Sequence, residues 1–117
     1  MIKIKNKLGT INISGAVLTI LTGDAATNCF GVKGMAFRSV SDGLVHLLKM
    51  ESMGKGVRIT YNDDGRLSIS LHIAVDQGVN IPVVCNSIIR QVRYKLNQSA
   101  GVEVENIDVF VDTMIIN

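Results

Sequence analysis

Residues 67–96 change their hydrophobic period once, and this change constrains the fold more than any other feature of the chain. In residues 67–75, apolar side chains occupy every second position, the period of a strand with one buried face: Leu67, Ile69, Leu71, Ile73 and Val75. Beyond Pro82 the spacing becomes about four, as on one face of a helix: Val84, Ile88, Val92 and Leu96. The pattern predicts a strand followed by a helix that packs on the same sheet.

The junction between the two periods carries a start signal for the helix. Its five residues are Gly78, Val79, Asn80, Ile81 and Pro82. Asn80 is a favoured N-cap, because its side-chain oxygen accepts a hydrogen bond from a free amide of the first turn. Pro82 fits the first turn because the amide that it lacks would have no partner there. We therefore interpret these five residues as a structural motif, and Gly101 as the end of the helix.

The composition fits one folded domain over residues 1–117. Hydrophobic residues make up 47% and charged residues 19%, which argues against disorder. No apolar run approaches the ~20 residues of a membrane span, and residues 1–5 alternate basic and apolar side chains instead of forming a secretory signal. The two cysteines form no CxxC pair. We expect a reduced cytoplasmic protein with no cofactor and no direct membrane insertion, and the net charge of +2 gives little support to nucleic-acid binding.

The first half of the chain predicts strand structure followed by two helices. Apolar alternation predicts a short strand or a pair of strands within residues 2–13, broken near residues 7–10, and Ser14 then caps a helix over residues 15–28. This helix is expected to close at Gly31 and to bury five residues: Val17, Leu18, Leu21, Ala25 and Cys29. A short helix is predicted to carry Leu44, Val45, Leu47 and Leu48.

The second half predicts a hairpin and a last strand. Residues 57–61 alternate and meet the next strand across residues 62–65, where an Asp-Gly pair is a strong hairpin signal. The last strand is expected over residues 106–113, with three residues facing inward: Ile107, Val109 and Val111. The predicted fold class is α+β in two layers, a mainly antiparallel sheet with two long helices packed on one face.

Several short segments together resemble those of one bacterial family. They are Ile13-Ser14 before an apolar helix, Gly31-Val32 with Gly34, residues 56–59, residues 78–82 followed by Val92, and residues 101–109. Over residues 11–111 they are similar to the alkaline-shock-protein family of small bacterial envelope stress response proteins. These motifs are structural glycines, a cap and a proline, so they indicate the fold and say little about chemistry. Gly15 and residues 22–24 depart from the usual first helix of the family.

The resemblance implies a non-enzymatic protein of Gram-positive-type bacteria. Members of the family are associated with cell-envelope homeostasis, self-association and indirect attachment to the membrane through a partner protein. The implied partners are a small membrane anchor protein or a kinase of the dihydroxyacetone- or fatty-acid-kinase type. The implied function is that of a non-catalytic scaffold.

Single polar residues give little support for catalysis or metal binding. His72 and His46 each lack a second histidine or cysteine at ligand spacing, which favours a structural role. Cys85 has no base at a suggestive spacing, which favours a small inert side chain over a nucleophile. Asp63 and Asp64 are explained by an exposed hairpin tip. We expect no catalytic, metal-binding or cofactor-binding residues.

An alternative interpretation is a KH-like RNA-binding module. Gly31, Val32, Lys33 and Gly34 have the GxxG form of the loop that clamps backbone nucleotides in KH domains. The predicted order of elements also fits such a module. Against it, aromatic residues are only 4% of the chain and offer few platforms for stacking on bases. Gly31 also already has a role as a helix end, so RNA binding is the second hypothesis.

Two groups of residues are candidates for an interaction surface. The first is a basic group on the exposed side of the last helix: Arg90, Arg93 and Lys95. The second is the apolar end of the chain: Met114, Ile115 and Ile116. Residues 3–5 are also expected to leave an exposed strand edge, which is a template for pairing with another chain. The sequence therefore predicts a homo-oligomer, most simply a dimer, held by strand edges or by the apolar end.

Overall fold

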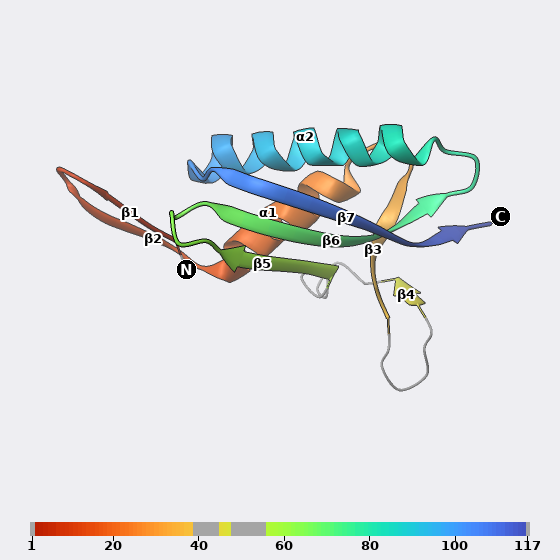
Figure 1. Ribbon diagram of the computed structural model, residues 1–117, viewed down its shortest axis with the longest axis horizontal. Coiled ribbons are helices and arrows are strands. Elements are labelled where there is room, and N and C mark those ends of the chain that lie inside the picture. Colours follow the sequence, from red (N-terminus) through yellow and green to blue (C-terminus); the bar gives the residue numbers. More distant parts are fainter. Residues whose placement is uncertain (1, 39–44, 48–55, 117) are drawn as a thin grey trace.

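The computed structural model describes residues 2–38, 45–47 and 56–116. Its elements are β1 (Ile2–Asn6), β2 (Gly9–Ile13), α1 (Gly15–Thr27), β3 (Val32–Arg38), β4 (Val45–Leu47), β5 (Val57–Tyr61), β6 (Leu67–Asp76), α2 (Ile81–Ala100) and β7 (Val104–Ile115). Both helices pack on one side of a curved sheet, and β1 and β2 form a separate hairpin, here called the arm, that projects from the body (Figure 1). The predicted α+β class is confirmed.

The central strand of the sheet is β6. One of its edges pairs antiparallel with β5 and then with β3, and its other edge pairs with β7 in parallel. The pairings of β1 with β2 and of β3 with β4 are also antiparallel. The parallel pair arises because α2 crosses over between β6 and β7 and returns the chain to the same end of the sheet. The sheet is therefore mainly antiparallel, as predicted.

The core lies between the helices and the sheet. Both apolar rows predicted from the change of period are buried there: Leu67, Ile69, Leu71, Ile73 and Val75 on β6, and Val84, Ile88, Val92 and Leu96 on α2. From α1, Leu18 and Ala25 join the same cluster. Thr22 is also fully buried, and its hydroxyl donates to the Leu18 carbonyl at 2.8 Å. That polar group is therefore not left unpaired in the core.

Both long helices begin at the predicted caps. Ser14 Oγ accepts a hydrogen bond from the Val17 amide at 3.3 Å, and Asn80 Oδ1 accepts one from the Val83 amide at 3.2 Å. Gly101 ends α2 with a left-handed backbone at φ +66°, as expected of a C-terminal glycine. Neither of these helices, the two that the structure describes, is long and apolar enough to cross a membrane.

Four details of the predicted elements are wrong. Asn28 caps α1, so Gly31 does not close that helix. Val17 is 47% exposed, because α1 is apolar around most of its circumference and the pattern did not decide which side faces the sheet. Residues 45–47 pair with β3 as a strand and not as a helix, while Leu44 and Leu48 lie outside the described residues. The last strand is longer than predicted, because the whole of β6 offers it a partner.

Candidate functional site

The junction motif, residues 78–82, lies where α2, β3 and β6 meet. A Cβ atom on Gly31 would lie 3.0 Å from Val79 Cγ1 and 3.1 Å from Val84 Cγ2, so the start of β3 approaches the junction too closely for a side chain. Gly31 also has φ +89°, a conformation that L side chains rarely adopt. Its carbonyl accepts a hydrogen bond from the Asp76 amide at 2.9 Å. The residues that carry the family resemblance therefore position α2 against β3 and β6.

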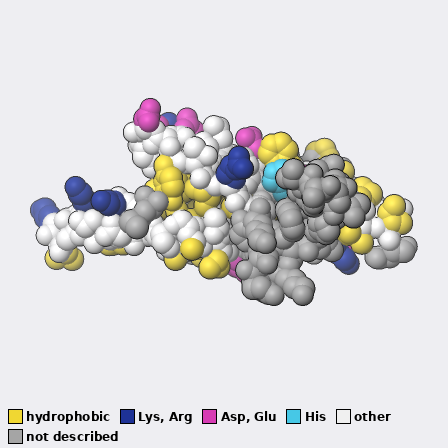
Figure 2. Space-filling model, turned by 90° about the horizontal axis from the view of Figure 1, so that it is seen from below, with side chains coloured by type: hydrophobic (Ala, Val, Ile, Leu, Met, Phe, Trp, Pro, Cys, Tyr) yellow, Lys and Arg dark blue, Asp and Glu magenta, His cyan; other side chains and the backbone are white. Residues whose placement is uncertain are grey.

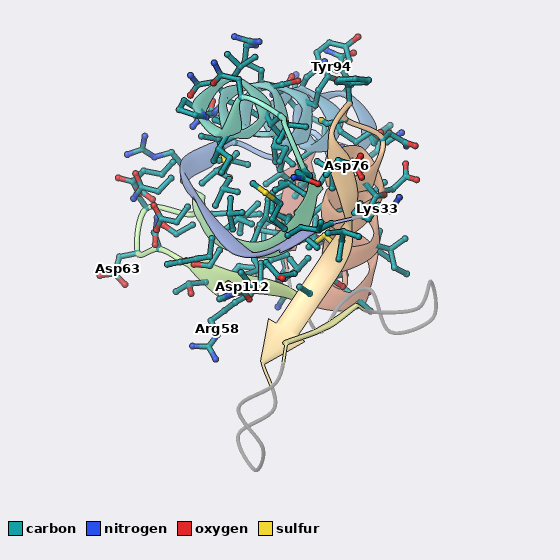
Figure 3. The ribbon with its side chains drawn as sticks, turned by 90° about the vertical axis from the view of Figure 1, so that its right-hand side faces the viewer. Lys33, Arg58, Asp63, Asp76, Tyr94 and Asp112 are labelled. Atoms are coloured by element: carbon teal, nitrogen blue, oxygen red, sulfur yellow. The ribbon has the colours of Figure 1, made fainter. Side chains whose placement is uncertain are left out.

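The segment predicted as a nucleotide-clamping loop is part of the sheet. Val32 pairs with Val75 and Gly34 with Ala74, so these residues lie in β3 and not in a loop between two helices. Lys33 and Asp76 lie side by side (Figure 3), with the ammonium 3.5 Å from the carboxylate. The GxxG interpretation is wrong in its geometry, because β3 begins directly after Gly31 and continues through Gly34 to Arg38, where a KH-like module needs a second helix.

Two of the three predicted basic residues line one hollow. Arg90 and Arg93 of α2 meet Arg66, which lies directly before β6, around a hollow of about 480 Å³ whose walls include the buried Val102 and Val104. We call this hollow the arginine groove. Lys95 lies 3.9 Å from Asp24 of α1 and does not line the groove. Tyr94 points outward from α2 (Figure 3) and is 64% exposed. No local pattern pointed to Arg66, because only the tertiary fold brings it to α2.

Carboxylates compensate part of this positive charge. The guanidinium of Arg66 donates to Asp64 Oδ2 from Nε at 2.9 Å and from Nη2 at 2.7 Å, and this hydrogen bonding lowers the pKa of Asp64. Arg66 Nη2 also lies 3.6 Å from Glu105 Oε1. The Arg93 guanidinium donates to the Glu105 carbonyl at 3.4 Å. Of the three arginines, only Arg66 forms ion pairs with carboxylates of the described residues.

Along its whole length, β7 is an outer strand of the sheet. Ten of its 12 residues pair with β6 on one side, and within the described part of the chain no strand pairs with its other side. Large apolar side chains are exposed on it or just after it: Phe110 48%, Met114 38% and Ile116 72%. The backbone of Ile115 is held in place, because its carbonyl accepts a hydrogen bond from the Gln77 amide at 3.1 Å. The predicted apolar end is therefore split into a fixed Ile115 and exposed neighbours.

A histidine–carboxylate pair bridges β6 and β7. His72 Nδ1 lies 2.9 Å from Asp112 Oδ2, and the imidazole stacks on Phe110 with ring centroids 4.8 Å apart. Asp112 and Arg58 lie on the side of the sheet away from α2 (Figure 3). His72 alternates with Leu71 and Ile73 along β6, and Phe110 and Asp112 alternate with Val109 and Val111 along β7. This alternation cannot place the three side chains together, because the parallel register that brings them into contact depends on the crossover.

The other polar candidates have ordinary surroundings. Cys85 is half-buried, and burial raises the pKa of its thiol, which disfavours the nucleophilic thiolate. Asp63 and Asp64 lie at the exposed tip between β5 and β6. His46 lies in β4, and its side chain is outside the described part of the structure. Among the described residues, no three histidine, cysteine, aspartate or glutamate side chains are grouped as metal ligands.

Comparison with known proteins identifies the relatives of this chain. Residues 3–116 match the model of the alkaline shock protein 23 family, described as having a cell envelope-related function. YloU of Bacillus subtilis (strain 168), an uncharacterized protein, is 32% identical over 111 residues, which cover 94% of this chain and 92% of that protein. The uncharacterized protein Spy1614 of Streptococcus pyogenes serotype M6 is 32% identical over 114 residues, or 97% and 93% of the two chains.

A solved structure shares the fold. A variant of MamM CTD superposes with a TM-score of 0.56 and covers 90% of this chain and 98% of its own, at 13% identity. At that identity the likeness concerns the fold alone. The family match extends over nearly all of the sequence, including the junction motif and the arginine groove. The chain therefore belongs to the alkaline shock protein 23 family, whose function is related to the cell envelope.

Proposed function

We propose that this protein is a non-catalytic scaffold of cell-envelope homeostasis that works by associating with itself and with protein partners. The observation that carries the proposal is the outer edge of β7, a long strand whose second side is unpaired among the described residues. An unpaired strand edge presents amide and carbonyl groups that a strand of another chain can bond. The family's envelope-related description supports the setting.

The proposed self-association uses the β7 edge and its exposed apolar residues. Natural proteins usually protect long strand edges with charge, proline or a covering element. Here Met114 and Ile116 stand at the end of the edge, 38% and 72% exposed. Strand addition supplies the main-chain hydrogen bonds, and burial of these side chains adds affinity and register. A homodimer is the simplest product, since two equal edges form a symmetric interface.

The arginine groove is the surface that we assign to a second protein. Arg66 lies directly before β6, while Arg90 and Arg93 lie on α2. Arginine is favoured at protein interfaces because its planar group makes several hydrogen bonds. The partner classes implied by the family resemblance are a small membrane anchor protein and a kinase of the dihydroxyacetone or fatty-acid type. We propose that the protein works in the cytoplasm and reaches the envelope through such a partner.

The test is the size of the protein in solution. Sedimentation of the full chain over a range of micromolar concentrations should show a dimer or a larger species. The double variant Met114→Lys with Ile116→Lys should weaken association about tenfold or more, because it adds charge to an edge and removes apolar contact, and tenfold corresponds to about 1.4 kcal/mol. A chain that is monomeric at high micromolar concentration would contradict the proposal.

The control places one such added lysine on another exposed apolar position. Val83 on α2 is 60% exposed, and Val83→Lys should leave the size distribution unchanged. If Val83→Lys weakens association as much as the double variant does, the interface is not on β7. Circular dichroism of each variant verifies that the fold is retained.

A further inference from the structure

The arm is an amphipathic ribbon. Its register pairs Ile2 with Ile13 and Ile4 with Ile11, which puts four isoleucines on one face, because directly paired residues share a face. Lys3 and Lys5 pair with Asn12 and Thr10 on the opposite face. Ile2 and Ile13 pack against the core. Farther out, Ile11 is 50% exposed, so the apolar face extends beyond the body that would cover it.

The tip of the arm exposes a leucine. Asn6 Oδ1 accepts hydrogen bonds from the Leu8 amide at 2.8 Å and from the Gly9 amide at 3.2 Å, which fixes a tight turn. Polar residues and glycine usually occupy such turns. Leu8 stands there with 98% of its surface exposed and contributes no burial to this fold. The stability of the protein therefore gives no reason for a leucine at this position.

The charge of the arm has one sign. Residues 1–23 include Lys3, Lys5 and Lys7 and contain no aspartate or glutamate. Lys3, nearest the body, lines a hollow with Asp64 and Glu103, so these carboxylates face the base of the arm. Lys5 and Lys7 lie toward the tip. Figure 2 shows the basic side chains along one side of the arm and hydrophobic side chains on the other.

We propose that the arm binds an anionic lipid surface, with its tip at the boundary between headgroups and acyl chains. Leu8 and the outer isoleucines, Ile4 and Ile11, would enter this boundary. Lys5 and Lys7 flank the tip and reach anionic headgroups, as long basic side chains do at membrane interfaces. The contact is interfacial and crosses no bilayer. It does not depend on self-association through β7.

The chemistry of the arm favours lipid over two other occupants. A nucleic acid would bind the lysines and leave Leu8 and Ile11 in water, and residues 2–13 contain no aromatic side chain to stack on bases. A second arm would bury the isoleucines but bring two sets of lysines together, and like charges repel. A surface with both negative charge and an apolar interior matches the two faces of the ribbon.

The experiment is co-sedimentation of the full chain with lipid vesicles. Vesicles of equal parts phosphatidylglycerol and phosphatidylcholine should bind the protein, and vesicles of phosphatidylcholine alone should bind it far more weakly. Lys5→Gln with Lys7→Gln should lower partitioning roughly 25-fold, since each lysine at an anionic surface contributes roughly fivefold. Leu8→Ser should lower it about tenfold, because the tip loses its apolar anchor.

The matched control removes two positive charges from the body. Arg58→Gln with Lys95→Gln changes the net charge by the same amount and should retain most of the binding. Unchanged circular dichroism is expected for every variant, because Leu8 and the two lysines are exposed.

Three outcomes would overturn the proposal. One is a wild-type chain that stays in the supernatant with anionic vesicles. Another is equal loss of binding in the arm variant and in the control. The third is a change in sedimentation size on Leu8→Ser without vesicles, which would place the arm on a second copy of the chain. The variant Met114→Lys with Ile116→Lys should still sediment with anionic vesicles, because the lipid contact does not depend on self-association through β7.

Discussion

The β6–α2–β7 unit and the arm use similar apolar residues in opposite ways. In the unit, β6 buries every second residue and α2 buries every fourth, so both rows meet in one core. In the arm, the isoleucine row begins at the core and continues outward until Leu8 is almost wholly in solvent. The first pattern is explained by stability. The second pattern is not explained by stability, and it indicates binding to a surface outside the chain.

The difference shows where to look for function in a protein whose described residues hold no group of metal-ligating side chains. A two-stranded ribbon on its own is marginally stable in water, so the arm depends on its base for order. Its outer half has few apolar contacts with the body. The outer half can therefore move from water to another environment with little loss of folding stability. The β6–α2–β7 unit cannot do so, because its side chains are close-packed in the core.

The largest contrast is expected from the same substitution made in both regions. Ile88→Ala removes a fully buried side chain of α2 and should lower the free energy of unfolding by about 3–4 kcal/mol, through lost burial and the cavity left behind. Ile11→Ala, at a half-exposed position of the arm, should cost under about 1 kcal/mol. Urea denaturation of both variants measures the two values. Equal values would mean that the arm is part of the core.

A smaller contrast is expected between two glycines with similar backbones. Gly31→Ala should cost about 2–3 kcal/mol, because the new Cβ meets Val79 and Val84 in addition to the strain of φ +89°. At Gly65, with φ +86°, a new Cβ would meet nothing within 4 Å, so Gly65→Ala should cost only about 1 kcal/mol. Denaturation midpoints compare the two. If the two substitutions lower the free energy of unfolding equally, the close approach of β3 to the junction does not contribute to stability.

A substitution at the N-cap of α2 tests the junction motif with a smaller expected loss of stability. Asn80→Ala removes the oxygen that accepts from the Val83 amide and should destabilise the protein by about 1 kcal/mol. Asn86→Ala changes the same residue type at an exposed position within α2 and should be neutral or slightly stabilising, since alanine favours helices. The same urea experiment applies. Equal effects would show that Asn80 does not act as a cap.

The smallest effect is expected at the turn that faces the base of the arm. Hydrogen bonds from Arg66 lower the pKa of Asp64 below its ordinary value of 3.8. The ionised carboxylate is therefore favoured in the folded state, and the stability that it contributes is present above the unfolded pKa and is lost as the pH falls through the folded pKa. An NMR titration should find the Asp64 pKa below 3.8, and Arg66→Gln should raise it. Arg58→Gln is the charge-matched control, and a pKa unaffected by Arg66→Gln would contradict the assignment.

Much of the fold follows from the sequence alone. The change of period predicts β6 and α2, because a half-buried strand and an amphipathic helix each have one apolar row. Asn80, Ser14 and the Asp-Gly turn act locally, so their roles could be read without the tertiary structure. The prediction for α1 is wrong at Val17, which is exposed, although Leu18 and Ala25 are buried as predicted. A helix that is apolar on most sides has no preferred face in sequence.

The candidate sites were less accessible to sequence reasoning, because they combine distant segments. Arg90 and Arg93 share a helix and were found together, but Arg66 joins them only through the fold. His72 meets Phe110 and Asp112 only in the parallel register of β6 with β7. The alternation of the arm was visible, yet its importance depends on how far it projects, and no local pattern specifies that projection.

Amide hydrogen exchange of the full chain, with and without anionic vesicles, tests the central contrast most directly. The free protein should protect β6, α2 and β7 strongly and should leave the outer half of the arm exchanging fast. Added vesicles should slow exchange in the arm and leave the unit unchanged. Strong protection of the arm in the free chain, or an arm that vesicles do not affect while binding occurs elsewhere, would contradict the account.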